Sequence, residues 1–376
     1  MDDFIAYEQK LARDPQLEAI LNNLQRIKRD PILGLYETVH IVVHPFVLFY
    51  GSEDLILPKN PTEADRTRME TKRAEMLQRL KRHEPFLRAY VEFFRKHWMK
   101  TLGLPEFKKT DLLFVWAFDN LKSFKLYQVR RGRQLPPGVV GFFNDRERFS
   151  FVYEDPTDRG MVLRTLAHEL THHLHWFFCR DPGGRFNNHF RRIKAVWLEE
   201  GWAEYVGAVV PFEKGWDFGG VLQSRIEMLH TCRKLKLPLV PLKDLVRRED
   251  YREWIAWVTL WLAKTLPDLK EVPKELRELS KLVQVLAYFE ILYAESWLFV
   301  KFLYEYEAGK YKKAILEFTK ASTRGYAGYT GARGYPQAHE VLEQLLGIKT
   351  RADWEPIQKE FDEYLEATLY AHPPKR

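Results

Sequence analysis

The residues with the clearest chemical content are His168-Glu169-Leu170-Thr171-His172, in the stretch LRTLAHELTHHLHWFF. Side chains four residues apart project from the same side of a helix, so His168 and His172 can both reach one metal ion. Glu169 lies between them, in a position to take a proton from a metal-bound water. This spacing is typical of zinc hydrolases.

The residues around the motif predict the helix that would position it. Its apolar face consists of Leu163, Leu166, Ala167, Leu170, Leu174, Phe177 and Phe178. The two histidines fall together on the other side of the same helix. A solvated polar face is the alternative, but besides Glu169 only Arg164 is charged in these turns. We therefore expect a helix with an apolar back and a metal-binding front.

A third ligand is expected from a later segment. A metzincin would have glycine at position 175 and histidine at 178, whereas this chain has His175 and Phe178, which excludes that class. The other common third ligand is a carboxylate from a following helix, and the segment WLEEGWAEY at 197–205 supplies candidates. Glu200 follows His172 after 27 intervening residues, and Glu204 lies one helical turn further on.

WLEEGWAEY resembles the W-x-x-E-G-x-A-E-Y segment of the gluzincin metallopeptidases, the clan of thermolysin and aminopeptidase N. The resemblance implies that Glu200 is the third zinc ligand and that Glu204 orients a ligand histidine, although Glu204 could be the ligand instead. It also implies one Zn²⁺ per chain, with water in the fourth position. Gly201 and Ala203 would let this helix approach the histidine helix closely. The resemblance covers residues 168–205, and the spacer is longer than in the best-known gluzincins.

Gluzincins add a tyrosine or histidine that stabilises the oxyanion of the tetrahedral intermediate. By the same resemblance, the candidate here is Tyr293, in the segment LYAESW. A tyrosine packed in the core is the alternative, since the chain has 18 tyrosines. Two further histidines follow the motif. His173 is expected to be structural or exposed, and His175 could support a ligand or contact substrate.

The order of the other elements predicts an α+β fold. A helix over 4–29, a strand over 39–50 and helical residues 62–101, broken near Pro85, precede a strand over 111–118 and a hairpin of 139–143 and 149–154. This order matches the small mixed β-sheet that lies over the active-site helix in gluzincins. Either arm of the hairpin could be the edge strand that pairs with a bound peptide, or the hairpin could simply close the sheet.

The rest of the chain is expected to be mainly helical. We predict an N-terminal α/β subdomain at 1–178 and a C-terminal helical subdomain at 179–376, with the active-site cleft between them. Helices are expected near 218–236, 252–265, 275–307, 310–323, 336–346 and 351–370. A glycine-rich stretch at 325–334 lacks the ending of a phosphate-binding loop and is expected to be a loop.

Composition narrows the class of protein. The chain has 376 residues, a net charge of +7 and no apolar run near the roughly 20 residues of a transmembrane helix. The start MDDFIAYEQK is not a signal peptide, so we expect a cytoplasmic protein, or an exported one if a leader was removed.

Residues 62–100 carry eleven Lys or Arg against six Asp or Glu. Because the acids are interleaved, a solvated helix pair is expected there rather than a nucleic-acid surface. Cys179 and Cys232 could pair, but buried free thiols are expected, and neither has the CxxC partner that a cysteine-based zinc site needs.

These observations predict a zinc-dependent metallopeptidase in which Glu169 activates a zinc-bound water against a peptide bond. One alternative is a non-catalytic zinc-binding or scaffold protein that kept the fold, but such a site would not need Glu169. The other is a zinc amidohydrolase acting on a non-protein amide. The substrate, the mode of cleavage (endo or exo) and the oligomeric state do not follow from the sequence.

Overall fold

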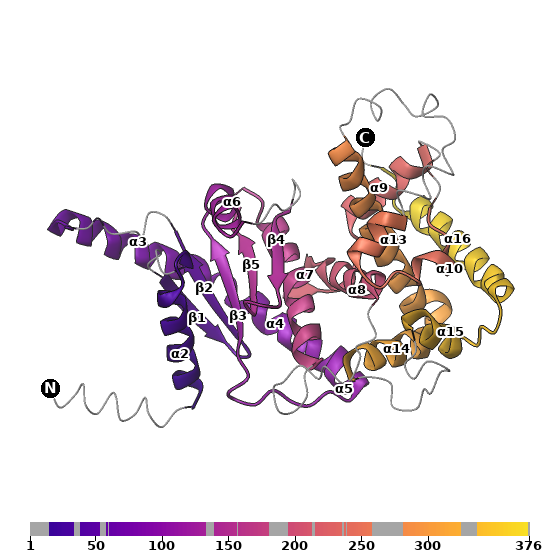
Figure 1. The fold of residues 1–376 in the computed structure, drawn as a ribbon, viewed down its shortest axis with the longest axis horizontal. Helices are drawn as coiled ribbons and strands as arrows, with labels where there is room; N and C mark the ends of the chain where they lie inside the picture. Colours follow the sequence, from indigo (N-terminus) through magenta and orange to yellow (C-terminus); the bar gives the residue numbers. More distant parts are fainter. Residues whose placement is uncertain are drawn as a thin grey trace. The chain divides into compact units, whose positions relative to one another are not determined.

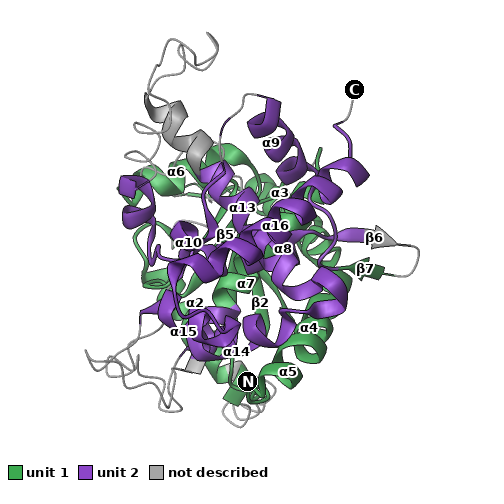
Figure 2. Ribbon diagram, turned by 90° about the vertical axis from the view of Figure 1, so that its right-hand side faces the viewer, with its two compact units in different colours: residues 1–173, 211–217 green, residues 174–210, 218–376 purple. Residues whose placement is uncertain are grey.

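The computed structural model describes residues 15–33, 38–52, 58, 60–132, 139–155, 157–179, 195–212, 215–234, 237, 239–257, 281–324 and 337–374. The chain forms two compact units (Figure 2). Unit 1 contains Met1–His173 and Pro211–Asp217, and unit 2 contains Leu174–Val210 and Phe218–Arg376. The subdomain boundary expected at 178/179, and a cleft there, stay predictions.

Unit 1 is built on a five-stranded mixed sheet with the order β1-β2-β3-β5-β4 (Figure 1). The pairs β2–β3 and β3–β5 are parallel, and the pairs β1–β2 and β4–β5 are antiparallel. The mixed α+β class predicted from the sequence is therefore confirmed at this level. The strands are β1 (Thr38–Val43), β2 (Phe46–Gly51), β3 (Leu113–Phe118), β4 (Gly141–Asn144) and β5 (Phe149–Tyr153).

The segment predicted as one strand over 39–50 is instead a hairpin. Its turn is His44-Pro45, between β1 and β2. Proline has no N–H to donate to a strand ladder, so it is accommodated in the turn and not within a strand. The prediction of a single strand was wrong, whereas the strand within 111–118 and the hairpin around 144–148 are confirmed.

The sheet is held by an aromatic core. Every residue of β2 and β3 is buried, as expected for strands paired on both sides and rich in aromatic and branched residues. On one side this core includes residues from α2 (Pro15–Arg29) and α6 (Leu121–Arg130). Residues 4–14 of the helix predicted from 4 to 29 lie outside the described residues. The core positions include Ile20, Ile27, Trp116, Phe118, Phe124, Tyr127, Phe149 and Phe151.

The predicted helical region 62–101 breaks just before Pro85, as expected. α3 (Glu63–Lys81) ends there, and α4 (Glu84–Phe94) starts with Pro85 in its first turn, where a missing N–H costs little. A π-helical turn over Arg95–Met99 and a short α5 (Lys100–Leu102) follow. The motif helix, α7, runs from Arg159 to Phe178. The hydroxyls of Tyr90 on α4 and Thr171 on α7 lie 3.0 Å apart and tie the two helices together.

Unit 2 is mainly helical, as predicted. The described part of the helix expected at 252–265 is helical over 251–257. A small two-stranded sheet of β6 (Val210–Phe212) and β7 (Gly215–Asp217), which belongs to unit 1 from Pro211 on, was not predicted. The glycine-rich stretch 325–334 lies outside the described residues. None of the described helices combines the length with the apolar character that crossing a bilayer requires. The helices after α7 are α8 (Val196–Gly207), α9 (Gln223–Lys234), α10 (Leu242–Leu245), α13 (Lys281–Gly309), α14 (Lys312–Arg324), α15 (Ala338–Leu346), a 3₁₀ turn (Arg351–Asp353) and α16 (Trp354–Ala371).

Close packing of α8 against α13 depends on Gly201. A Cβ at this position would lie 2.5 Å from the backbone oxygen of Ser296 and 2.5 Å from Cγ2 of Val300, both on α13. From the sequence, Gly201 was expected to let α8 approach the histidine helix; the atoms nearest to its Cβ position belong to α13, so its small size serves the packing on α13. Trp197 stacks on Phe318 of α14, which fixes α8 from a second side. Glu200 thus extends from a helix with little freedom to shift.

A buried carboxylic acid lies in the core of unit 2. Glu295 on α13 is 1% exposed, and its Oε1 accepts a 2.6 Å hydrogen bond from the backbone N–H of Val240. Its Oε2 has no hydrogen-bond partner among the described residues. Burial raises the pKa of Glu295 to about 8, against the lowering effect of the Val240 N–H. The side chain is therefore held in its neutral form at neutral pH.

We predict that Gly201→Ala destabilises the protein by about 1–3 kcal/mol, the usual cost of forcing extra volume into a packed core. The backbone of Ser296 cannot rotate away from the added methyl as a flexible side chain could. Thermal melting measures the loss. Gly160→Ala is the control, because that helical glycine faces mainly the flexible end of Arg164, 3.2 Å away. An equal loss in both variants would contradict the packing argument.

We predict that Glu295→Gln removes a destabilisation that grows with pH. Below the ordinary pKa of 4.5 both the folded and unfolded states are protonated. Between 4.5 and about 8 only the unfolded state loses its proton, so the free energy of unfolding falls as pH rises. The variant should gain up to about 3 kcal/mol at pH 7, at about 1.4 kcal/mol per pH unit. Urea unfolding at pH 4.5, 6 and 8 tests this, with exposed Glu355→Gln as the control. A pH-independent difference would refute it.

Candidate metal centre

The two motif histidines face each other on α7. The Nε2 atoms of His168 and His172 lie 3.0 Å apart, and their rings meet edge to face at 73°. Two nitrogens that bind one tetrahedral zinc at about 2.0–2.1 Å would be roughly 3.3 Å apart. The observed spacing is close to that value, so the pair fits the first two positions of such a site.

Glu169 is buried beside the edge of the sheet. It is 6% exposed, and a Cβ added to Gly141 of β4 would lie 3.1 Å from its Cγ. The same Cβ would lie 2.6 Å from Cγ2 of Thr165, so the β4 backbone approaches α7 closely at this point. From the sequence, either arm of the hairpin could be the edge strand. In the structure β4 is the edge and β5 lies inside the sheet.

Contacts from β5 and β4 hold this part of α7. The Ser150 hydroxyl lies 3.1 Å from Nδ1 of His173 and donates a 3.3 Å hydrogen bond to the backbone oxygen of Glu169. The ring of Phe143 packs on the His173 ring, with centroids 4.6 Å apart. His173 is 1% exposed and has the structural role expected of it.

His175, the next histidine, belongs to unit 2. It is buried, and its Nε2 lies 3.3 Å from the hydroxyl of Ser322 on α14. This contact attaches the ring to α14. The ligand-supporting or substrate-contact role considered from the sequence stays a prediction.

Glu200 on α8 is 2% exposed, and its Oε1 accepts a hydrogen bond from the Tyr251 hydroxyl. A carboxylate buried this deeply needs hydrogen bonds or a positive charge to offset its loss of water. The candidate ligand atoms of His168, His172 and Glu200 all lie within 4.8 Å of one another. In the described part of the chain, the three residues predicted as ligands therefore form a group that could hold a metal ion.

Glu204, the other candidate carboxylate, is engaged by an arginine. Arg225 of α9 donates to both of its oxygens, from Nε and Nη2, at 2.8 Å each. Arg225 also pairs with Glu290. Burial opposes the charge on Arg225, but the two carboxylates outweigh it and hold the pKa of the guanidinium above its ordinary value. This ion pair compensates the charge of Glu204. Glu200, by contrast, belongs to the group formed with His168 and His172.

Tyr293 lies on α13 and is partly buried. The Arg225 guanidinium lies over its ring, 5.2 Å from the centroid, and Phe289 is its neighbour at 6.4 Å. These contacts place the ring beside the Glu204–Arg225 pair. Its role toward an oxyanion stays a prediction.

Two residues near the site were missed by sequence reasoning. Tyr251 is 51 positions from Glu200, and Arg225 is 21 positions from Glu204. Asp250 does signal a helix start, since its side chain accepts from the backbone N–H groups of Arg252 and Glu253. Nothing local indicates which carboxylate either residue would reach.

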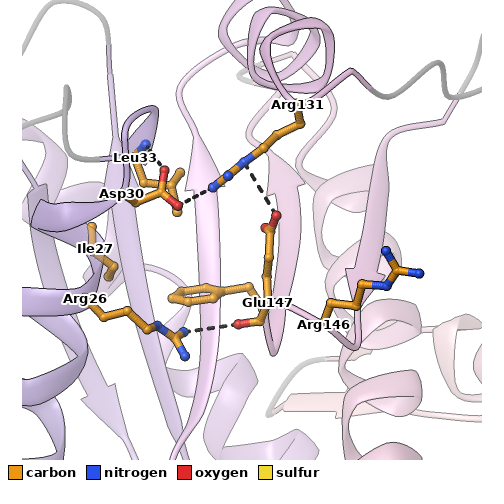
Figure 3. Close-up of a pocket in the computed structure, with 8 residues that line it drawn as sticks. Arg26, Ile27, Asp30, Leu33, Arg131, Arg146 and Glu147 are labelled. Atoms are coloured by element: carbon orange, nitrogen blue, oxygen red, sulfur yellow. Dashed lines mark hydrogen bonds and ion pairs between the residues drawn. The ribbon is translucent and has the colours of Figure 1, made fainter.

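A cavity of about 220 Å³ in unit 1 involves none of these residues (Figure 3). Its charges largely pair with one another. Arg131 pairs with Asp30 and Glu147, and Arg26 donates to the Glu147 backbone oxygen at 3.1 Å. The cavity is lined by Arg26, Ile27, Asp30, Leu33, Arg131, Arg146, Glu147 and Phe149.

No model of a known protein family matches the chain, and no curated protein matches it either. The resemblance to gluzincins therefore rests on the sequence between residues 168 and 205 and stays a prediction.

Proposed function

We propose that this protein is a zinc-dependent metallopeptidase of gluzincin type. The observation that carries the proposal is the His168–His172–Glu200 group, whose candidate ligand atoms lie within 4.8 Å of one another. Glu169, on the same helix as the two histidines, adds a buried carboxylate. A purely structural metal site would have no use for that group.

The donor set fits zinc. Two imidazole nitrogens and one carboxylate oxygen are the ligands of many catalytic zinc sites, which keep a further position for water or substrate. When bound, zinc would polarise a substrate carbonyl and lower the pKa of a water molecule. Calcium and magnesium prefer sites made of oxygen ligands, which makes them poorer candidates for a site with two histidines.

Glu169 would carry the proton in the reaction. Its carboxylate takes a proton from the attacking water as the new C–O bond forms, and then delivers it to the leaving amine as the C–N bond breaks. The hydrogen bond from Ser150 to the Glu169 backbone oxygen, and the contact of β4 with α7, restrain this residue. Restraint of this kind is what proton transfer over a short distance requires.

The edge strand β4 supports a peptide as the substrate. A sheet edge offers backbone N–H and C=O groups to an extended chain, which can add to the sheet as another strand. Because Gly141 brings this edge next to Glu169, a peptide paired with β4 would pass the proton-transfer group. This supports a peptide over the alternative of a non-protein amide.

We predict that Glu169→Gln retains zinc but loses about 10²–10⁴-fold in turnover, because only proton transfer is removed. His172→Ala should lose the zinc itself. Elemental analysis and digestion of a peptide library, read by mass spectrometry, measure the two effects.

Glu199→Gln and His230→Ala serve as controls and should change neither quantity. Zinc retained at full stoichiometry in His172→Ala would overturn the ligand assignment. A wild-type protein that binds zinc but cleaves no peptide would reject the peptidase and leave the two alternatives, a non-catalytic zinc protein and a zinc amidohydrolase acting on a non-protein amide.

We predict that Tyr293→Phe lowers kcat with little change in KM, if its hydroxyl donates to the oxyanion in the transition state. Loss of one such donor costs about 10²–10³-fold. The Arg225 contact with the ring should persist in the variant, so the melting temperature should stay close to the wild-type value. A kcat within a few-fold of wild type would leave Tyr293 as a packed residue and remove it from the mechanism.

A further inference from the structure

We propose that Tyr251 is a positioning residue that holds Glu200 in the orientation needed for metal binding. This inference rests on the proposed function, since it concerns the same metal site. The Tyr251 hydroxyl donates directly to Oε1 of Glu200. Tyr251 would act through this carboxylate and would not itself touch the reacting atoms.

The need for such a donor follows from the surroundings of Glu200. α8 is buried from Val196 to Gly207 except for Glu199, and Glu200 itself is 2% exposed. A carboxylate buried to this degree depends mainly on protein groups for its hydrogen bonds. The Tyr251 phenol supplies one. With this bond in place, rotation of the carboxylate about its Cγ–Cδ bond is restricted.

The backbone around Tyr251 is itself fixed to α8. The backbone oxygen of Arg248 accepts a 3.3 Å hydrogen bond from the N–H of Val196, in the first turn of α8. Asp250 then caps the helix that begins with Tyr251, through bonds of 2.8 and 3.0 Å to the next two backbone N–H groups. The segment that carries the phenol is therefore held in register with the helix that carries Glu200.

The ring of Tyr251 has a second restraint. It packs against Phe289 of α13, with ring centroids 5.8 Å apart. The residue is nevertheless 39% exposed, so it contributes less to the core than the buried tyrosines do. Removal of the hydroxyl should therefore change the site without unfolding unit 2.

The expected consequence is a loss of metal affinity. Groups that hydrogen-bond to metal ligands typically account for about 10–100-fold in affinity. Without the phenol, Glu200 would lose its orienting bond, and metal binding would have to restrict its rotation. Tyr293, by contrast, contacts Arg225 and Phe289.

The test compares the full chain with Tyr251→Phe and Tyr251→Leu by zinc titration against a competing fluorescent chelator. We expect both variants to bind Zn²⁺ about 10–100-fold more weakly than wild type, while their metal-free melting temperatures stay similar. In Co²⁺-loaded protein, the visible absorption spectrum should also change in both variants. Tyr370→Phe, at a position that is 91% exposed, is the control and should behave as wild type.

The outcomes separate this inference from the proposed function. Wild-type protein that binds no zinc would refute the proposed function. Wild-type protein that binds zinc, with an unchanged Kd and Co²⁺ spectrum in Tyr251→Phe, would refute the role of Tyr251 alone. Weaker binding in Tyr251→Leu but not in Tyr251→Phe would assign the effect to ring packing and would also overturn the role of the hydroxyl.

Discussion

A carboxylate almost fully removed from water is the constraint around which unit 2 is arranged. Glu200 extends from an apolar helix, so the free energy lost on dehydration has to be recovered from fixed partners. α8 can present it only because Gly201 allows close contact with α13 and Trp197 is stacked on α14. Nearby, Glu204 is compensated separately, by Arg225. Two acids one turn apart therefore have different partners and different chemical capacities.

The parts of the site that could be predicted from sequence are those determined within one or two helical turns. The facing nitrogens of His168 and His172 follow from helical geometry, and the apolar face of α7 follows from the same periodicity. Strand β3 and the β4–β5 hairpin were predicted because runs of aromatic and branched residues, bounded by polar turns, have few alternatives. The break before Pro85 has an equally local cause, since proline has no N–H with which to continue the preceding helix.

The rest depends on contacts distant in the sequence. From the sequence, Gly201 was expected to lie toward the histidine helix. Its nearest neighbours are Ser296 and Val300 of α13, about 95 residues later in the chain, and the sequence around Gly201 does not indicate them. The hydrogen bond of Tyr251 and the ion pair of Arg225 depend equally on how the helices of unit 2 pack. Within 39–50, the strong β pattern did not reveal that the chain reverses direction, because the same residues suit one long strand or two short antiparallel strands. Composition and spacing carry no information on the helix packing, whereas Pro45 did mark the point at which a strand ladder is interrupted.

The path of the chain through the two units has a consequence for biosynthesis. Neither unit is a contiguous stretch, since residues 211–217 return to unit 1 after the chain has begun unit 2. Trp216 in this returning segment packs edge to face on Phe86 of α4, at 5.6 Å. On the ribosome, unit 1 can therefore reach its full set of contacts only after α8 has emerged. Truncation of the chain at a single position cannot yield one complete unit without part of the other, because each unit consists of two separate segments.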